Sequence, residues 1–197
     1  ASVLVASLAA LVWWARRHET CRWPALALLA GFVGMLIETA VLLHVQVTRG
    51  VVLEEAGFLI ACFMGGVSAG ALGVDRFKGR ARWWGGGAVV ATLALCVGFL
   101  GAVRGGAGLS IGGAGLVLAG AGGLVGALFG VASLAMPGHT GRSPAGLYAA
   151  DVAGGCLGGI AATLVLVPGA GLDGTAIVAA IGVVLAGISL GNFLGGK

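Results

Sequence analysis

The sequence predicts an all-α protein, a polytopic transmembrane helix bundle of six to seven glycine-rich spans that forms a single domain over residues 1–197. Two observations predict this class. Hydrophobic residues make up 59% of the chain and charged residues only 9%, against roughly 25% charged residues in soluble domains. Long apolar stretches also follow one another with short connections between them. We therefore expect the lipid bilayer to be the solvent, in a cell membrane and specifically a bacterial inner membrane.

The first four apolar stretches lie at about 2–14, 24–48, 51–74 and 83–103. The last three of these are long enough to cross a membrane, because a transmembrane helix needs about 20 apolar residues. The first stretch is shorter, and for this reason the predicted number of spans is six to seven.

The remaining stretches lie at about 109–136, 144–167 and 174–194, and each is again long enough to cross. The middle one has the clearest ends. Ser143 followed by proline has the form of a helix N-cap with proline at the first helical position, and Pro168 ends the stretch. No soluble domain is expected, since none of the connections reaches ten residues.

Basic residues concentrate in alternate connections between the predicted spans, nine in one set and two in the other. Because cytoplasmic connections carry the excess of Lys and Arg, the N-terminus is expected outside and the C-terminus in the cytoplasm. All five tryptophans fall at the predicted cytoplasmic interface, where an amphipathic indole is well placed. This topology accounts for the net charge of +4, so no nucleic-acid partner is expected. The nine residues are Arg16, Arg17, Arg22, Arg76, Lys78, Arg80, Arg82, Arg142 and Lys197; the two are Arg49 and Arg104.

Small residues recur at intervals of four in three of the spans. Such stripes let helix backbones approach closely, since helices in lipid associate through packing and weak hydrogen bonds rather than through hydrophobic expulsion. We assign these glycines to helix packing, beyond the glycine enrichment that is general in membrane helices. The stripes are Gly57-Ala61-Gly65-Ala69-Gly73, Gly122-Gly126-Gly130 and Ala150-Gly154-Gly158-Ala162, and Gly66, Gly70, Gly155 and Gly159 complete the predicted packing set.

Two carboxylates lie inside predicted spans, Glu38 and Asp151, with no Lys or Arg in the middle of any span. An ionised carboxylate at such depth is costly, so each is expected to be protonated or to face a cation or a water-filled cavity. At 1.5 Å per residue, the two are offset by roughly 9 Å along the membrane normal. In one interpretation they are steps of a proton or cation path, with His44 and Gln46 near the outer mouth and Tyr148 beside Asp151. In the other, each carboxyl only hydrogen-bonds a neighbouring helix.

No cofactor, metal site or enzymatic activity is predicted. Haem b would need two imidazoles at similar depth, and His44 is the only histidine clearly within a span. No pair of potential ligands has metal-binding spacing within a span. The glycine-rich runs follow no strand, as a nucleotide site would require, and the four cysteines form no CxxC motif.

Two stretches resemble a known family. They contain residues 38–46 with Gly50 and Gly57, then Phe63-Met64-Gly65-Gly66 and Gly70-Ala71-Leu72-Gly73, and later residues 147–159 closed by Pro168. This pattern is similar to the membrane part of spermidine-synthase-like membrane proteins, which are often described as fused with a major-facilitator-like region. The resemblance covers roughly residues 30–172. It implies one of two related membrane halves, without the soluble aminopropyltransferase domain and hence without synthase activity.

Two functions follow as alternatives. The first is a non-catalytic integral-membrane subunit that anchors or scaffolds a larger membrane assembly, such as an energy-converting or electron-transfer complex, with other membrane subunits as partners. The second is a small proton-coupled transporter of a cationic, polyamine-like metabolite that uses Glu38 and Asp151. A second copy of the chain would then restore the two-half architecture as a homodimer. The packing stripes, the missing half and the lack of a soluble domain favour the first.

Overall fold

The computed structural model describes residues 2–18, 21–50, 53–76, 81–106, 108–135 and 144–195, and within these ranges it contains helices and no strand. The predicted all-α class is confirmed. Five helical stretches of the described chain are long and apolar enough to cross a membrane. The elements are α1 (Ser2–Arg17), α2 (Arg22–Arg49), α3 (Leu53–Arg76), α4 (Ala81–Arg104), α5 (Ile111–Ala135), α6 (Pro144–Ile160), the π-helical segment η3 (Ala161–Leu166) and α7 (Val167–Gly195).

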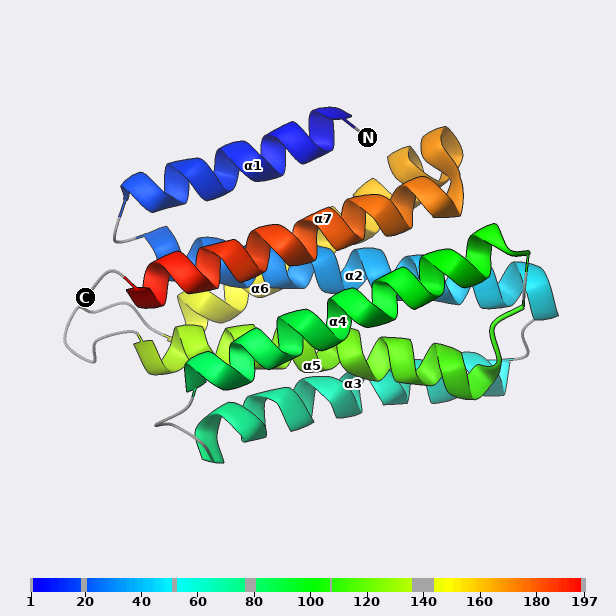
Figure 1. The fold of residues 1–197 in the computed structure, drawn as a ribbon, viewed down its shortest axis with the longest axis horizontal. Coiled ribbons are helices and arrows are strands. Elements are labelled where there is room, and N and C mark those ends of the chain that lie inside the picture. The colour runs from blue at the N-terminus through cyan, green and yellow to red at the C-terminus, as the bar shows by residue number, and fades with distance from the viewer. Residues whose placement is uncertain are drawn as a thin grey trace.

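The last three elements follow one another without a break, but they do not form one straight helix. Gly171 lies inside α7 with φ 69° and ψ −176°, a backbone conformation that favours glycine because it lacks a Cβ. Figure 1 shows the chain reversing its direction near this position, so that the later part of α7 runs back against η3. The apolar stretch Ala145–Gly191 therefore consists of two antiparallel legs. This accounts for the two stretches that the sequence predicts there.

Successive helices run alternately up and down the bundle, so that each connection lies at one of its two ends (Figure 1). Arg17, Arg22 and Arg76 lie at one end, which we call the basic end. Arg49 and Arg104 lie at the other, which we call the Arg104 end. The predicted cap Ser143 and the basic residues Lys78, Arg80, Arg142 and Lys197 lie outside the described residues.

α2 lies at the centre of the bundle and packs against α5, α6 and α7. In its most apolar window 72% of the residues are buried, against 22% in the windows of α3 and α4. α3 packs mainly on α5, and α4 packs on α5 and α7. α1 contacts α2 and α7 through Leu8, Val12 and Ala15, which recur at helical spacing. The bundle thus has a buried central helix and two helices, α3 and α4, with largely exposed outer faces.

Candidate functional site

Glu38 lies near the middle of α2 and is nine-tenths buried, with 8% of its surface exposed. No hydrogen bond or ion pair to its carboxyl group occurs among the described residues. Burying a polar group without a partner costs free energy. No structural hydrogen bond explains Glu38, although its carboxyl oxygens are not fully buried as Oδ1 of Asp151 is.

Asp151 lies on α6, directly against Gly31 of α2. A Cβ atom at Gly31 would overlap the backbone oxygen of Asp151 and would lie 2.9 Å from its Oδ1. Only a glycine at this position lets the two helices come so close. Oδ1 of Asp151 is buried and has no hydrogen-bond partner among the described residues.

The two carboxylates lie on the same side of α2. Glu38 follows Gly31 by seven residues, which is about two helical turns. The two residues therefore point in directions that differ by only about 20°, and they are separated by roughly 10 Å along the helix axis. The space between them is apolar, since a Cβ atom at Gly155 or Gly159 would lie 3.3 or 3.5 Å from the side chain of Met35. The structure thus places Glu38 and Asp151 along one helix contact but about two turns apart, with a methionine side chain between them.

The π-helical segment η3 lies beside the Glu38 side of α2. α2 and α6 run parallel, and Gly158 meets Phe32, so six residues further on Glu38 is level with η3. α2 also contacts η3 directly. Single π-helical turns within α-helices occur frequently at functional sites. The region where Glu38 is level with η3 is therefore the best candidate in the described chain for a site of chemistry within the bundle.

The other residues predicted for this path lie elsewhere. His44 follows Glu38 by six residues, so its side chain leaves α2 about 120° away. Its ring meets Phe99 of α4 edge-on, with centroids 5.5 Å apart, and its buried Nε2 has no partner among the described residues. Gln46 is exposed, and Tyr148 is 63% exposed although it lies one turn before Asp151. The structure brings none of the three to the α2 side that carries the carboxylates.

The contact between α3 and α5 is built from glycines on both helices. A Cβ atom at Gly66 or Gly70 would overlap backbone atoms of α5, and one at Gly122 or Gly126 would overlap backbone atoms of α3. Gly130 continues this contact, because its Cβ would lie 3.2 Å from a valine side chain of α3. The two backbones therefore touch along about two turns, and a side-chain contact at Gly130 extends the packing.

The contact between α2 and α6 is likewise built from glycines that let the two helices approach closely. A Cβ atom at Gly154 or Gly158 would overlap the backbone of α2, and Gly155 and Gly159 receive the side chain of Met35. These four glycines of α6 all face α2. Close approach of these helices is what holds Asp151 against Gly31.

The predicted stripe of the third span faces outward instead. Gly57 and Gly65 are exposed, and a Cβ atom added at either would have no neighbour within 4 Å, while Gly73 is half-buried. Ala61 and Ala69 of the same stripe are exposed as well. α3 thus carries small residues on two faces, one packed on α5 and one without a partner among the described residues.

Three polar contacts were not predicted from the sequence. Thr92 of α4 is buried and donates a hydrogen bond from Oγ1 to the backbone oxygen of Gly120 in α5 at 3.1 Å. Arg104 and Asp173 form an ion pair of 3.8 Å at the Arg104 end. The guanidinium of Arg17 lies 3.7 Å from the ring centroid of Trp13. A threonine inside an apolar span is a signal that a sequence search for interhelical hydrogen bonds would find.

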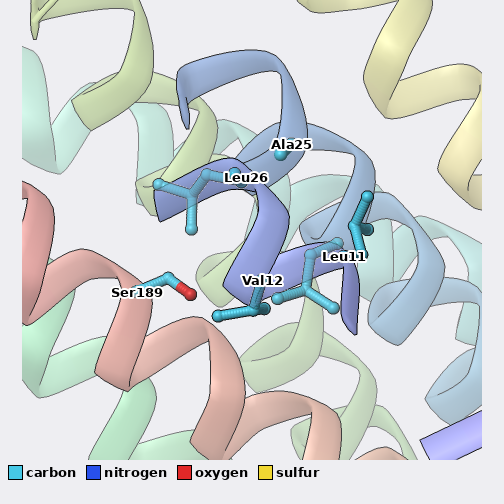
Figure 2. A pocket seen from close by; sticks show the side chains of 7 residues that line it. Leu11, Val12, Ala25, Leu26 and Ser189 are labelled. Atoms are coloured by element: carbon cyan, nitrogen blue, oxygen red, sulfur yellow. The ribbon is translucent and has the colours of Figure 1, made fainter. Parts of the chain in front are cut away.

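A small cavity lies where α1 joins the bundle. Figure 2 shows Leu11, Val12, Ala25, Leu26 and Ser189 around it, and its volume is about 10 Å³. This is the least volume that holds one water molecule, roughly 10–15 Å³. Its one polar side chain, Ser189, already donates a hydrogen bond to the Leu185 oxygen at 2.7 Å. The cavity is a packing gap under α1 rather than a ligand site.

Comparison with known protein families, with curated proteins and with solved structures found no match to this chain. The resemblance to spermidine-synthase-like membrane proteins therefore stays a prediction from the motifs.

Proposed function

We propose that this chain is a non-catalytic integral-membrane subunit that anchors or scaffolds a larger membrane assembly. The observation that carries the proposal is the outward face of α3, where Gly57, Ala61, Gly65 and Ala69 are exposed. The opposite face of the same helix shows how such glycines act, because Gly66 lets α5 come into backbone contact. A helix of a neighbouring subunit can dock on the outer face in the same way.

The shape of this outer face supports helix docking. Met64 and Leu72 project from it with 56% and 68% of their surface exposed, and Gly57 and Gly65 lie on the same face. Large side chains next to glycines form the ridges and gaps by which helices interdigitate. Such a surface offers a neighbouring helix both gaps to enter and side chains to receive.

The outer face of α4 has the same character. Gly87, Gly98 and Gly101 have no neighbour within 4 Å of a Cβ position, and Val90 and Val97 are 67% and 65% exposed. α3 and α4 are the two peripheral helices whose apolar windows are least buried. A chain with two such faces is suited to join neighbours in an assembly.

The membrane orientation is part of the proposal. We place the basic end in the cytoplasm and the N-terminus outside, in a bacterial inner membrane. Support comes from the separation of Arg17, Arg22 and Arg76 from Arg49 and Arg104 at opposite ends of the bundle. Cytoplasmic ends of membrane helices carry such an excess of Arg and Lys.

A matched pair of substitutions tests the docking face. Gly65→Leu fills the outer face of α3, and Gly112→Leu places the same side chain at an exposed position of α5 that also has open space around it. Both variants should fold. We expect Gly65→Leu to lose its partner subunits when it is extracted from its native membrane in mild detergent, whereas Gly112→Leu keeps them. Retention of the full assembly by Gly65→Leu would contradict the proposal.

A second candidate function is proton-coupled transport of a cationic metabolite by a homodimer. The specific observation in its favour is that Glu38 is nine-tenths buried without a partner among the described residues and shares a side of α2 with Asp151. Carboxylates in this setting can bind a cation or carry a proton. Glu38→Gln and Asp151→Asn should then abolish proton-driven spermidine uptake into proteoliposomes that contain only this chain. Equal uptake by the wild type and both variants would rule this function out.

A further inference from the structure

Two apolar grooves run along α7 toward the Arg104 end. The α1 groove lies between α1 and α7, has a volume of about 450 Å³ and is walled by Val5 and Ala9 of α1. The α4 groove lies between α7 and α4, has a volume of about 360 Å³ and is walled by Leu100 of α4. Both are lined by Ile177 and Ile181, which form a ridge between them. Figure 1 shows α7 lying between α1 and α4 in this arrangement.

An ion pair lies at the mouth of both grooves. Arg104 ends α4 one turn beyond Leu100, and Asp173 directly precedes Gly174, which lines the α1 groove. Arg104 Nε and Asp173 Oδ2 are 3.8 Å apart, and the two side chains are 59% and 48% exposed. A cation and an anion thus lie side by side, half-exposed, where the grooves open. The exposed pair itself contributes little stability.

Each groove is short enough to lie within one leaflet of a bilayer. On α7 the α1 groove is lined from Gly174 to Ile181, roughly 10 Å of helix, and the α4 groove from Ile177 to Leu185, roughly 12 Å. Half of the hydrocarbon core is about 15 Å thick. A partner helix that crosses the membrane would need a groove of about twice this length. An acyl chain from the leaflet at the Arg104 end is long enough to fill either groove.

We propose that the two grooves and the Arg104–Asp173 pair bind one diacyl phospholipid whose headgroup carries both a phosphate and a primary ammonium, as in phosphatidylethanolamine. The two acyl chains lie on either side of the ridge formed by Ile177 and Ile181. The guanidinium of Arg104 binds the phosphate, for which its planar fork of donors is well suited. The carboxylate of Asp173 accepts hydrogen bonds from the ammonium, which has three donors.

The headgroup decides specificity, because acyl chains gain little by exchanging bulk lipid for an apolar groove. Phosphatidylglycerol offers a phosphate without a cation, so its negative charge would lie near Asp173 without compensation. Phosphatidylcholine has a cation without N–H donors. Both lipids should therefore bind more weakly than phosphatidylethanolamine.

Native mass spectrometry of the purified chain in detergent, titrated with each of the three lipids, tests the headgroup assignment. The wild type should bind one phosphatidylethanolamine at least about tenfold more tightly than phosphatidylglycerol, the effect of one charge-assisted hydrogen bond. Arg104→Gln should weaken phosphatidylethanolamine binding about tenfold, and Asp173→Asn should abolish the preference over phosphatidylglycerol. Arg49→Gln is the matched control, since it removes an exposed arginine at the same end. A wild type without preference, or an equal loss with Arg49→Gln, would overturn the proposal.

A second set of variants tests the grooves. Ala9→Trp fills the α1 groove and Ala180→Trp fills the α4 groove, whereas Ala94→Trp adds the same side chain on the outer face of α4. Lipid binding should be lost in the first two and kept in the third, with thermal unfolding midpoints that match the wild type. Retained binding in both groove variants would show that the lipid lies elsewhere.

Discussion

The packing of α3 on α5 predicts opposite effects at two adjacent positions of α3. Gly66 faces α5, and a Cβ atom there would overlap the backbone of Ala119, well inside the 3.0 Å that real Cβ atoms keep. Gly65 is exposed with open space around a Cβ position. Both glycines lie in the middle of the same helix, so the intrinsic helix propensity changes equally when either becomes alanine.

The two substitutions should change the free energy of unfolding in opposite directions. Alanine is favoured over glycine in a helix by about 1 kcal/mol, and this gain is available to Gly65→Ala. At Gly66 the obstacle is backbone, which cannot rotate away as a side chain does, so the two helices must separate. Overpacking of this kind costs about 1–3 kcal/mol, which offsets or exceeds the propensity gain. Gly66→Ala should therefore be less stable than Gly65→Ala by about 1–3 kcal/mol.

The assay is equilibrium unfolding in mixed detergent micelles, with the denaturing detergent as the variable and helical circular dichroism as the signal. The midpoint of Gly65→Ala should equal or exceed that of the wild type, and the midpoint of Gly66→Ala should be lower. Gly122→Ala, on the α5 side of the same contact, should behave like Gly66→Ala. Equal midpoints for Gly65→Ala and Gly66→Ala would refute the assignment of the packed face.

Three further predictions concern a hydrogen bond, a backbone conformation and the membrane orientation. Thr92→Val removes the hydrogen bond to the Gly120 oxygen and should lower the free energy of unfolding by about 0.6–2 kcal/mol, measured in the same micelles. Gly171→Ala should cost about 1–3 kcal/mol because φ 69° with ψ −176° is a conformation that essentially only glycine adopts, whereas Gly169→Ala, at a position with open space and no positive φ, should not destabilise. In a cysteine-free background, Gly106→Cys should react with an impermeant maleimide added outside intact cells and His18→Cys should not; the reverse pattern would invert the orientation.

Much of the fold follows from the length of the apolar stretches. The predicted span 24–48 corresponds to α2, Arg22–Arg49, and the span 109–136 corresponds to α5, Ile111–Ala135. A membrane requires this agreement, because every span must satisfy its backbone hydrogen bonds as a helix of fixed minimum length. The sequence also indicates the break between the last two stretches, since Pro168 and nearby glycines precede the reversal at Gly171.

The faces of the helices were harder to predict. Gly65 and Gly66 are adjacent, so α3 has a glycine pattern on both faces, and spacing alone does not tell which face meets α5. The position of Glu38 and Asp151 along their own helices follows from the sequence, but the groups that surround them depend on which helices pack against α2. Tyr148 shares a helical face with Asp151 by spacing, yet it lies at the edge of the α2 contact and is exposed. The spacing of residues within one helix does not show where the neighbouring helices lie.

The central claim is that this chain serves as a subunit of a larger membrane assembly. Its most direct test is the mass and protein composition of the particle that carries the chain after extraction from its native membrane in mild detergent. Our account predicts a particle that contains other membrane subunits in fixed stoichiometry with this chain. A particle made only of copies of this chain would contradict the claim and would favour the transport function of Glu38 and Asp151.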